Sequence, residues 1–106
     1  MYGTNHTVSD NTFQYQVQQG ITIASGNGIS VTNNIIENNA QGGLGITGQF
    51  PGTGCITDPE TYTVTGNTIE YNSSYAVEIT QAGCSVNVGP VPLSSYNTIS
   101  GSVIYQ

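Results

Sequence analysis

The stretch "VTNNIIENN" (residues 31–39) returns as "VTGNTIEYN" (residues 64–72), with the same polarity at nearly every position. Two related copies flank this pair, "VSDNTF" before it and "SSYNTI" after it. The copies align on four asparagines that are 23, 33 and 30 residues apart: Asn11, Asn34, Asn67 and Asn97. A recurrence at this period indicates a fold built from stacked, similar units.

Each copy contains short apolar alternations of period two, such as Ile29/Val31 and Leu44/Ile46, and no helical spacing. This alternation is typical of short β-strands. Three short strands in a unit of about 23 residues predict an all-β fold, a parallel β-helix with rungs about 4.8 Å apart. Equivalent side chains should then lie in columns, which we expect to form the core: Val8, Val31 and Val64; Phe13, Ile36, Ile69 and Ile99; Ile23, Ile46 and Ile79.

The four repeated asparagines are predicted to form a structural ladder. A turn inside a narrow rod leaves backbone groups unpaired, and stacked amides can bond both to each other and to the turn. Asn39 and Asn72 suggest a second, shorter ladder.

The segments "VTNNIIENN…GLGI" and "VTGNTIEYN…AVEI" resemble the right-handed parallel β-helix repeats of the pectate-lyase-like superfamily. The resemblance implies one solenoid domain over residues 1–106, with about three coils and a partial fourth. Two Gly/Pro-rich stretches, at about 47–61 and 80–94, are expected to be loop insertions. That superfamily includes enzymes, tailspikes, adhesins and structural rods, so the resemblance leaves function open.

The chain has no lysine or arginine, one histidine and six acidic residues, for a net charge of −6. Without cations to neutralise phosphates, nucleic-acid binding is excluded, as is a polybasic membrane-surface patch. No apolar run reaches the roughly 20 residues of a membrane span, so we expect no membrane insertion. Below about pH 3 only two positive charges would remain, which predicts tolerance of acid.

The surface must consist largely of amides and hydroxyls, because Asn, Thr, Ser and Gln supply 43 of the 106 residues. This composition is similar to that of archaeal surface filament proteins, and it favours an extracellular or cell-surface location, a virion included. Cys55 and Cys84, both in the interrupting stretches, favour a structural disulfide over free buried thiols. Asn5 and Asn72 begin N-x-S/T sequons and are candidate glycosylation sites, with Asn72 preferred.

Catalytic motifs of the superfamily are missing. Its lyases use Lys or Arg, and its galacturonases use clustered aspartates, whereas this chain has only Asp10 and Asp58, in different parts of the repeat. Glu37 and Glu70 occupy equivalent positions about 5 Å apart, and solvated turn glutamates are favoured over a catalytic pair or a calcium site. Glu78 and His6 are expected on the surface. We therefore expect no enzyme activity, no metal and no cofactor.

Both ends of the predicted rod would expose unpaired strands, because no capping element is recognisable. Joining the end of one copy to the start of the next would place Asn97 and Asn11 20 residues apart, close to the uninterrupted 23-residue unit. The sequence therefore predicts an extracellular structural subunit that stacks head to tail into a filament or adhesive rod. The alternative is a carbohydrate-binding or polysaccharide-degrading module, with Tyr62, Tyr71 and Tyr75 stacking on sugars.

Overall fold

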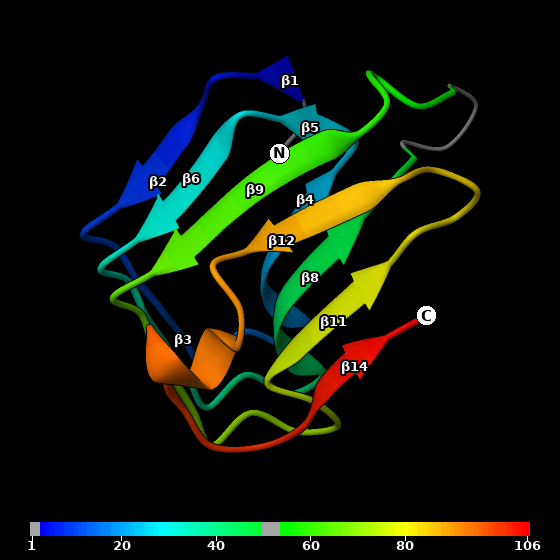
Figure 1. The fold of residues 1–106 in the computed structure, drawn as a ribbon. Coiled ribbons are helices and arrows are strands. Elements are labelled where there is room, and N and C mark those ends of the chain that lie inside the picture. The colour runs from blue at the N-terminus through cyan, green and yellow to red at the C-terminus, as the bar shows by residue number, and fades with distance from the viewer. Residues whose placement is uncertain (1–2, 50–53) are drawn as a thin grey trace.

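The protein consists of parallel β-sheets (Figure 1). The computed structural model describes residues 3–49 and 54–106, and these contain β-strands and one short 3-10 helix but no α-helix.

The first sheet contains β2 (Thr7–Ser9), β6 (Ile29–Thr32), β9 (Glu60–Thr65) and β12 (Val86–Gly89). The second contains β3 (Thr12–Gln14), β7 (Ile35–Glu37), β10 (Thr68–Glu70) and β13 (Thr98–Ile99). The third contains β4 (Gln19–Ala24), β8 (Gly42–Thr47), β11 (Val77–Thr80) and β14 (Val103–Tyr105). A small two-stranded sheet pairs β1 (Gly3–Thr4) with β5 (Gly26–Asn27).

The chain passes through the three large sheets in the same order four times. We call one strand from each sheet, in sequence order, a rung. Strands of successive rungs pair in parallel and in the predicted register; for example, Val8 pairs with Val31 and Val31 with Val64. The other two predicted columns also pair residue by residue. The all-β class and the stacking of equivalent residues are therefore confirmed.

The core lies between the three sheets. It is built largely from the column residues of the two middle rungs, of which Ile36, Ile46 and Ile69 are completely buried. At the ends of the stack burial is uneven, because Ile23 of the first rung is also completely buried, whereas Phe13 of the first rung and Ile99 of the last are only partly buried. Alternation along each strand explains this core, because every second side chain of a strand points to the same face.

The two predicted insertions need correction. The stretch 80–94 is not only a loop, because it contains β12, whose Val86 and Val88 pair with Glu60 and Tyr62 of β9. The first sheet consequently has a fourth strand, and each large sheet has four strands instead of three and a partial fourth. The apolar alternation of "VNVG" outweighs the flanking glycine and prolines. The 3-10 helix η1 (Leu93–Ser95) then connects β12 to β13.

The stretch 47–61 also ends earlier than predicted, because β9 begins at Glu60. Between β8 and β9 the described residues form bends and one antiparallel bridge, from Gln49 to Cys55. Residues 50–53 of this predicted insertion, and residues 1–2 of the predicted end-to-end junction, lie outside the described residues.

Candidate functional site

The predicted asparagine ladder runs through the interior along the turn between the first and second sheets. The backbone N–H of each asparagine donates to the Oδ1 of the asparagine in the next rung, at 3.0 Å from Asn11 to Asn34, 2.9 Å from Asn34 to Asn67 and 3.0 Å from Asn67 to Asn97. The Nδ2 groups of Asn34, Asn67 and Asn97 donate back to the carbonyls of Val8, Val31 and Val64. Each inner asparagine side chain therefore satisfies backbone groups of the preceding rung, and its own N–H is satisfied by the asparagine side chain of the following rung.

A second ladder follows the turn between the second and third sheets. Gln16 N–H donates to Asn39 Oδ1, and Asn39 N–H and Nδ2 both donate to Asn72 Oδ1. Asn72 Nδ2 donates to the Ile36 carbonyl at 2.9 Å. A glycan on Asn72 would have to be attached to an Nδ2 group that is half-buried and already holds this hydrogen bond, whereas Asn5 is exposed. The structure therefore favours Asn5 over Asn72 as a glycan acceptor, opposite to the preference from sequence.

The remaining predicted polar residues do not converge on a catalytic site. Glu37 and Glu70 pair in register and are half-buried, and Glu37 Oε1 accepts a hydrogen bond from Gln14 Nε2 at 3.4 Å. Glu78 accepts one from Gln106 at 3.2 Å on an exposed face. Separate exposed positions hold the other three predicted residues: His6, Asp10 and Asp58.

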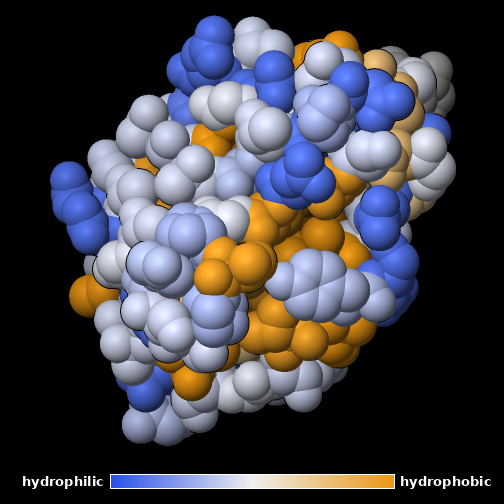
Figure 2. All heavy atoms as spheres, viewed as in Figure 1, coloured by the Kyte–Doolittle hydropathy of each residue, from blue (hydrophilic) through white to orange (hydrophobic). Residues whose placement is uncertain are grey.

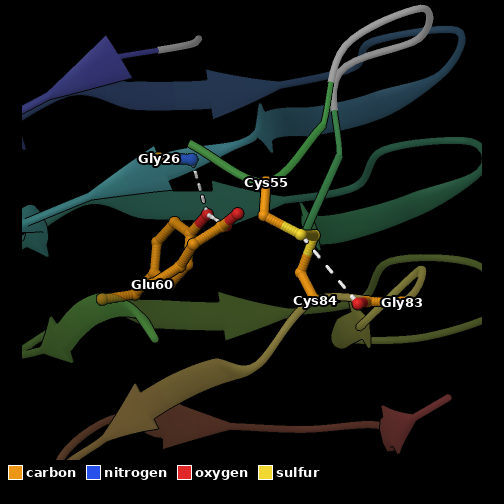
Figure 3. Close-up of a disulfide and its surroundings, with 6 residues drawn as sticks. Gly26, Cys55, Glu60, Gly83 and Cys84 are labelled. Atoms are coloured by element: carbon orange, nitrogen blue, oxygen red, sulfur yellow. Dashed lines mark hydrogen bonds between the residues drawn. A yellow bond between two sulfur atoms is a disulfide. The ribbon is translucent and has the colours of Figure 1, made fainter. Parts of the chain in front are cut away.

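The predicted disulfide between Cys55 and Cys84 is present, with Cα atoms 5.7 Å apart. Cys55 lies in the segment between β8 and β9, and Cys84 in the segment between β11 and β12, so the bond ties together two connections that leave the third sheet (Figure 3). Cys55 Sγ also lies 3.9 Å from the Gly83 carbonyl. This is a contact only, because a disulfide sulfur carries no hydrogen.

A buried glutamate beside this disulfide was not singled out from the sequence. Glu60 is 0 % exposed, and its Oε1 accepts a 2.7 Å hydrogen bond from the Tyr62 hydroxyl. The Tyr62 oxygen accepts a second bond of 2.7 Å from Gly26 N–H (Figure 3). Glu60 Oε2 has no hydrogen-bond partner among the described residues. The alternation "ETYTVT" could have revealed this residue, because Glu60, Tyr62 and Val64 must share the inward face of β9.

Glu60 and the two sulfur atoms lie within 4.8 Å of one another, and they are the one group of three potential metal ligands in residues 3–49 and 54–106. Thiolates bind metals, whereas both sulfurs here are in a disulfide. The distinguishing property of Glu60 is instead the raised pKa of its carboxyl. Burial raises the pKa of the Glu60 carboxyl, although the hydrogen bond from Tyr62 and the nearby backbone N–H groups partly oppose the shift.

The raised pKa of Glu60 predicts a protein that is more stable in mild acid than at neutral pH. The folded chain holds the proton more tightly than the unfolded chain, where a glutamate has a pKa of about 4.3. This contribution is therefore complete below about pH 4 and is lost as the pH rises through the folded-state pKa. Thermal unfolding followed by circular dichroism between about pH 4 and 8 should show a melting temperature that falls as the pH rises.

Glu60→Gln should flatten this dependence, because the amide oxygen can still accept the Tyr62 hydrogen bond without titrating. Glu78→Gln, at a more exposed position, serves as the matched control and should retain the dependence on pH. A wild-type melting temperature that rises between about pH 4 and 7, or an unchanged profile in Glu60→Gln, would contradict the assignment.

Two of the three tyrosines proposed for sugar stacking are buried and cannot contact a sugar at the surface. Tyr62 is 3 % exposed because it lies on the inward face of β9, and Tyr75 is 6 % exposed, with its ring packed against Gly42. A methyl group on Gly42 would overlap that ring, so the glycine makes room for it. Burial also raises the pKa of both phenols. Of these three tyrosines, Tyr71 alone presents its ring to solvent.

Comparison with protein-family models, curated proteins and solved structures gives no match for this chain.

Proposed function

We propose that the chain is a right-handed parallel β-helix subunit of an extracellular structural assembly, stacking end to end with further copies into a filament or adhesive rod. The parallel pairing of equivalent strands in four successive rungs supports the solenoid. The disulfide supports an oxidising, extracellular location.

The observation that carries the proposal is that the core is left partly uncovered at the two ends of the stack. The partly buried apolar residues packed against the core are Phe13 and Ile21 in the first rung, and Val86, Ile99 and Val103 in the last. Figure 2 shows apolar atoms gathered between β12 and β14, two strands of the last rung. Another rung at either end would cover these side chains, as the inner rungs cover each other.

The hydrogen-bonding groups at the two ends are complementary. Among the described residues, the Asn97 N–H at one end and the Asn11 Oδ1 at the other have no partner. Inside the stack these two groups bond to each other across every step of the ladder. A second copy in the same orientation would therefore extend the ladder by one more bond of the same type.

The last rung also presents free backbone donors. Thr98 N–H and Ser100 N–H both bond to the preceding rung, so the Ile99 N–H between them points away from the stack. In the same way, Gln106 N–H bonds to the Ile79 carbonyl, and the Tyr105 N–H points outward. Outward donors on an exposed edge are suited to pairing with another strand.

No helix in residues 3–49 and 54–106 has the length and apolar character needed to cross a membrane.

Replacing Tyr105 with proline tests the proposed stacking. Proline removes the outward N–H without touching a bond inside the chain, and proline is tolerated on strand edges that face solvent. Wild-type protein should form growing rods in sedimentation and electron microscopy at high concentration, whereas Tyr105→Pro should remain short. Tyr105→Thr is the matched control, because it removes the same ring but keeps the N–H, and it should still assemble. Wild-type protein that stays monomeric, or a proline variant that assembles equally well, would refute the proposal.

A further inference from the structure

A shallow hollow of about 510 Å³ lies on the side of the stack, across the first three rungs. It is formed where three successive rungs turn from the second sheet to the third, by residues 15–17, 38–40, 71 and 73. The backbone links these turns directly, because Tyr15 N–H donates to the Asn38 carbonyl and Asn38 N–H donates to the Glu70 carbonyl. Gln14, Glu37 and Glu70 pair in register, so the residues that follow them, Tyr15, Asn38 and Tyr71, form one column, which we call the tyrosine column.

The two tyrosines of this column have large aromatic side chains that are mostly exposed to solvent. Tyr15 is 76 % exposed and Tyr71 is 67 % exposed, although the other residue of the column, Asn38, shows that a polar residue fits the same turn. The rings add no packing to the core. Their presence is thus unexplained by folding.

The backbone at these positions makes tyrosine an unfavourable choice. Tyr15, Asn38 and Tyr71 have φ angles of 58°, 58° and 59°, in the left-handed region that asparagine and glycine adopt most readily. The turn between the first and second sheets has the same requirement and fills it with Asp10, Asn33 and Gly66. A bulky residue such as tyrosine adopts this conformation less readily than asparagine or glycine, so its presence strains the backbone. Two strained, exposed aromatic residues in one hollow point to a binding role.

The second asparagine ladder makes the hollow rigid. Gln16, Asn39 and Asn72 directly follow the tyrosine column, and their hydrogen bonds join all three turns at 3.1 Å or less. The rings are therefore carried on a backbone whose positions are fixed before any ligand binds. Such preorganisation lowers the entropy lost on binding.

The chemistry of the hollow selects the ligand. Aromatic faces beside amides and hydroxyls suit sugar rings, whose C–H faces pack on tyrosine while their hydroxyl groups bond to Gln, Asn and Ser. Glu37 and Glu70 directly precede the turns, and the chain has no lysine or arginine, so an anionic sugar would be repelled. The two tyrosines are two rungs apart, about 10 Å. That separation requires a ligand of several sugar units.

We propose that the tyrosine column binds a neutral polysaccharide lying along the direction in which the rungs stack. This role goes beyond the proposed assembly, since the column lies on the side of the stack and the assembly contacts lie at its ends. In an assembled rod, each subunit would bind the polysaccharide through its own tyrosine column, so the rod would be held to the polysaccharide along its whole length.

The double substitution Tyr15→Asn/Tyr71→Asn tests the site, because asparagine is the residue that the middle turn already uses. Affinity electrophoresis through gels containing a soluble mixed-linkage glucan, dextran or galactomannan should retard the wild type in at least one of them, and a polygalacturonate gel should not. The asparagine variant should bind about tenfold more weakly or worse. Its melting temperature should be equal to or above that of the wild type, because the backbone strain is relieved.

Two controls separate ring stacking from structural damage and from assembly. Tyr15→Phe/Tyr71→Phe keeps both rings and should bind within about threefold of wild type. Tyr96→Asn removes an exposed ring elsewhere and should not change binding. Tyr105→Pro should bind normally, so that failure of assembly is distinguished from failure of binding. The proposal is overturned if none of the three neutral gels retards the wild type, if the asparagine variant is retarded equally, or if polygalacturonate is the polymer bound.

Discussion

Asn67→Ala is expected to lower the free energy of unfolding by about 3–5 kcal/mol, a large part of the roughly 5–15 kcal/mol typical of a domain. Asn67 is 1 % exposed, and its Oδ1 accepts hydrogen bonds from Asn34 N–H and Asn34 Nδ2. Its Nδ2 donates to the Val31 carbonyl at 2.8 Å. Alanine would remove these hydrogen bonds from the buried Asn34 N–H and the Val31 carbonyl, whereas Asn34 Nδ2 would keep its bond to the Val8 carbonyl, and it would add a small cavity.

Denaturant unfolding monitored by circular dichroism measures the effect. Asn11→Ala is the matched control: Asn11 belongs to the same ladder but is exposed, and its side chain makes one bond, to the Ser9 carbonyl. It should cost less than about 1 kcal/mol. Because Asn34 and Asn67 bond to each other, their double substitution should cost less than the sum of the two single ones. Equal losses at Asn11 and Asn67 would show that burial in the ladder has no special energetic weight.

Removing the disulfide with Cys55→Ser/Cys84→Ser should lower the free energy of unfolding by roughly 3–4 kcal/mol. The bond closes a loop of 29 residues, and its loss returns conformational entropy mainly to the unfolded chain. Denaturant unfolding of the variant, compared with the oxidised wild type, gives the difference. Reduction of the wild type should produce a loss of similar size.

The slope of the unfolding curve against denaturant provides a further check, because unfolded chains without the cross-link expose more surface. An unchanged midpoint after removal of both cysteines would contradict the stabilising role.

Much of the fold follows from the sequence because the repeat fixes which residues lie above one another. Once Asn34 and Asn67 are aligned, the register of every neighbouring strand is set, and the valine and isoleucine columns follow. The repeat gives no information about register in the stretches that interrupt it. β12 was missed because its valines stand among glycine and proline, and because η1 separates it from the asparagine that marks the rung.

Whether a candidate site residue could be placed correctly from the sequence depended on knowing which face of its strand the side chain occupies. A sugar-stacking role requires Tyr62 on the surface, but alternation with Val64 places it inside, and the same alternation identifies Glu60 as a buried acid. Tyr75 could not be placed, because its burial depends on the space left by Gly42, a residue distant in sequence. The tyrosine column was missed because sequence alone does not reveal that Tyr15 and Tyr71 share the φ angle of Asn38.

The uniform direction of the paired strands gives the stack two chemically distinct tips, one offering the Asn97 N–H and the other the Asn11 oxygen. A polymer of such subunits would be vectorial, with a leading and a trailing terminus, and two growing fibres meeting at like tips could not fuse. A subunit disabled at a single tip, such as Tyr105→Pro, would then act as a chain terminator. A small proportion of it mixed with wild type would set fibre length without lowering the number of fibres.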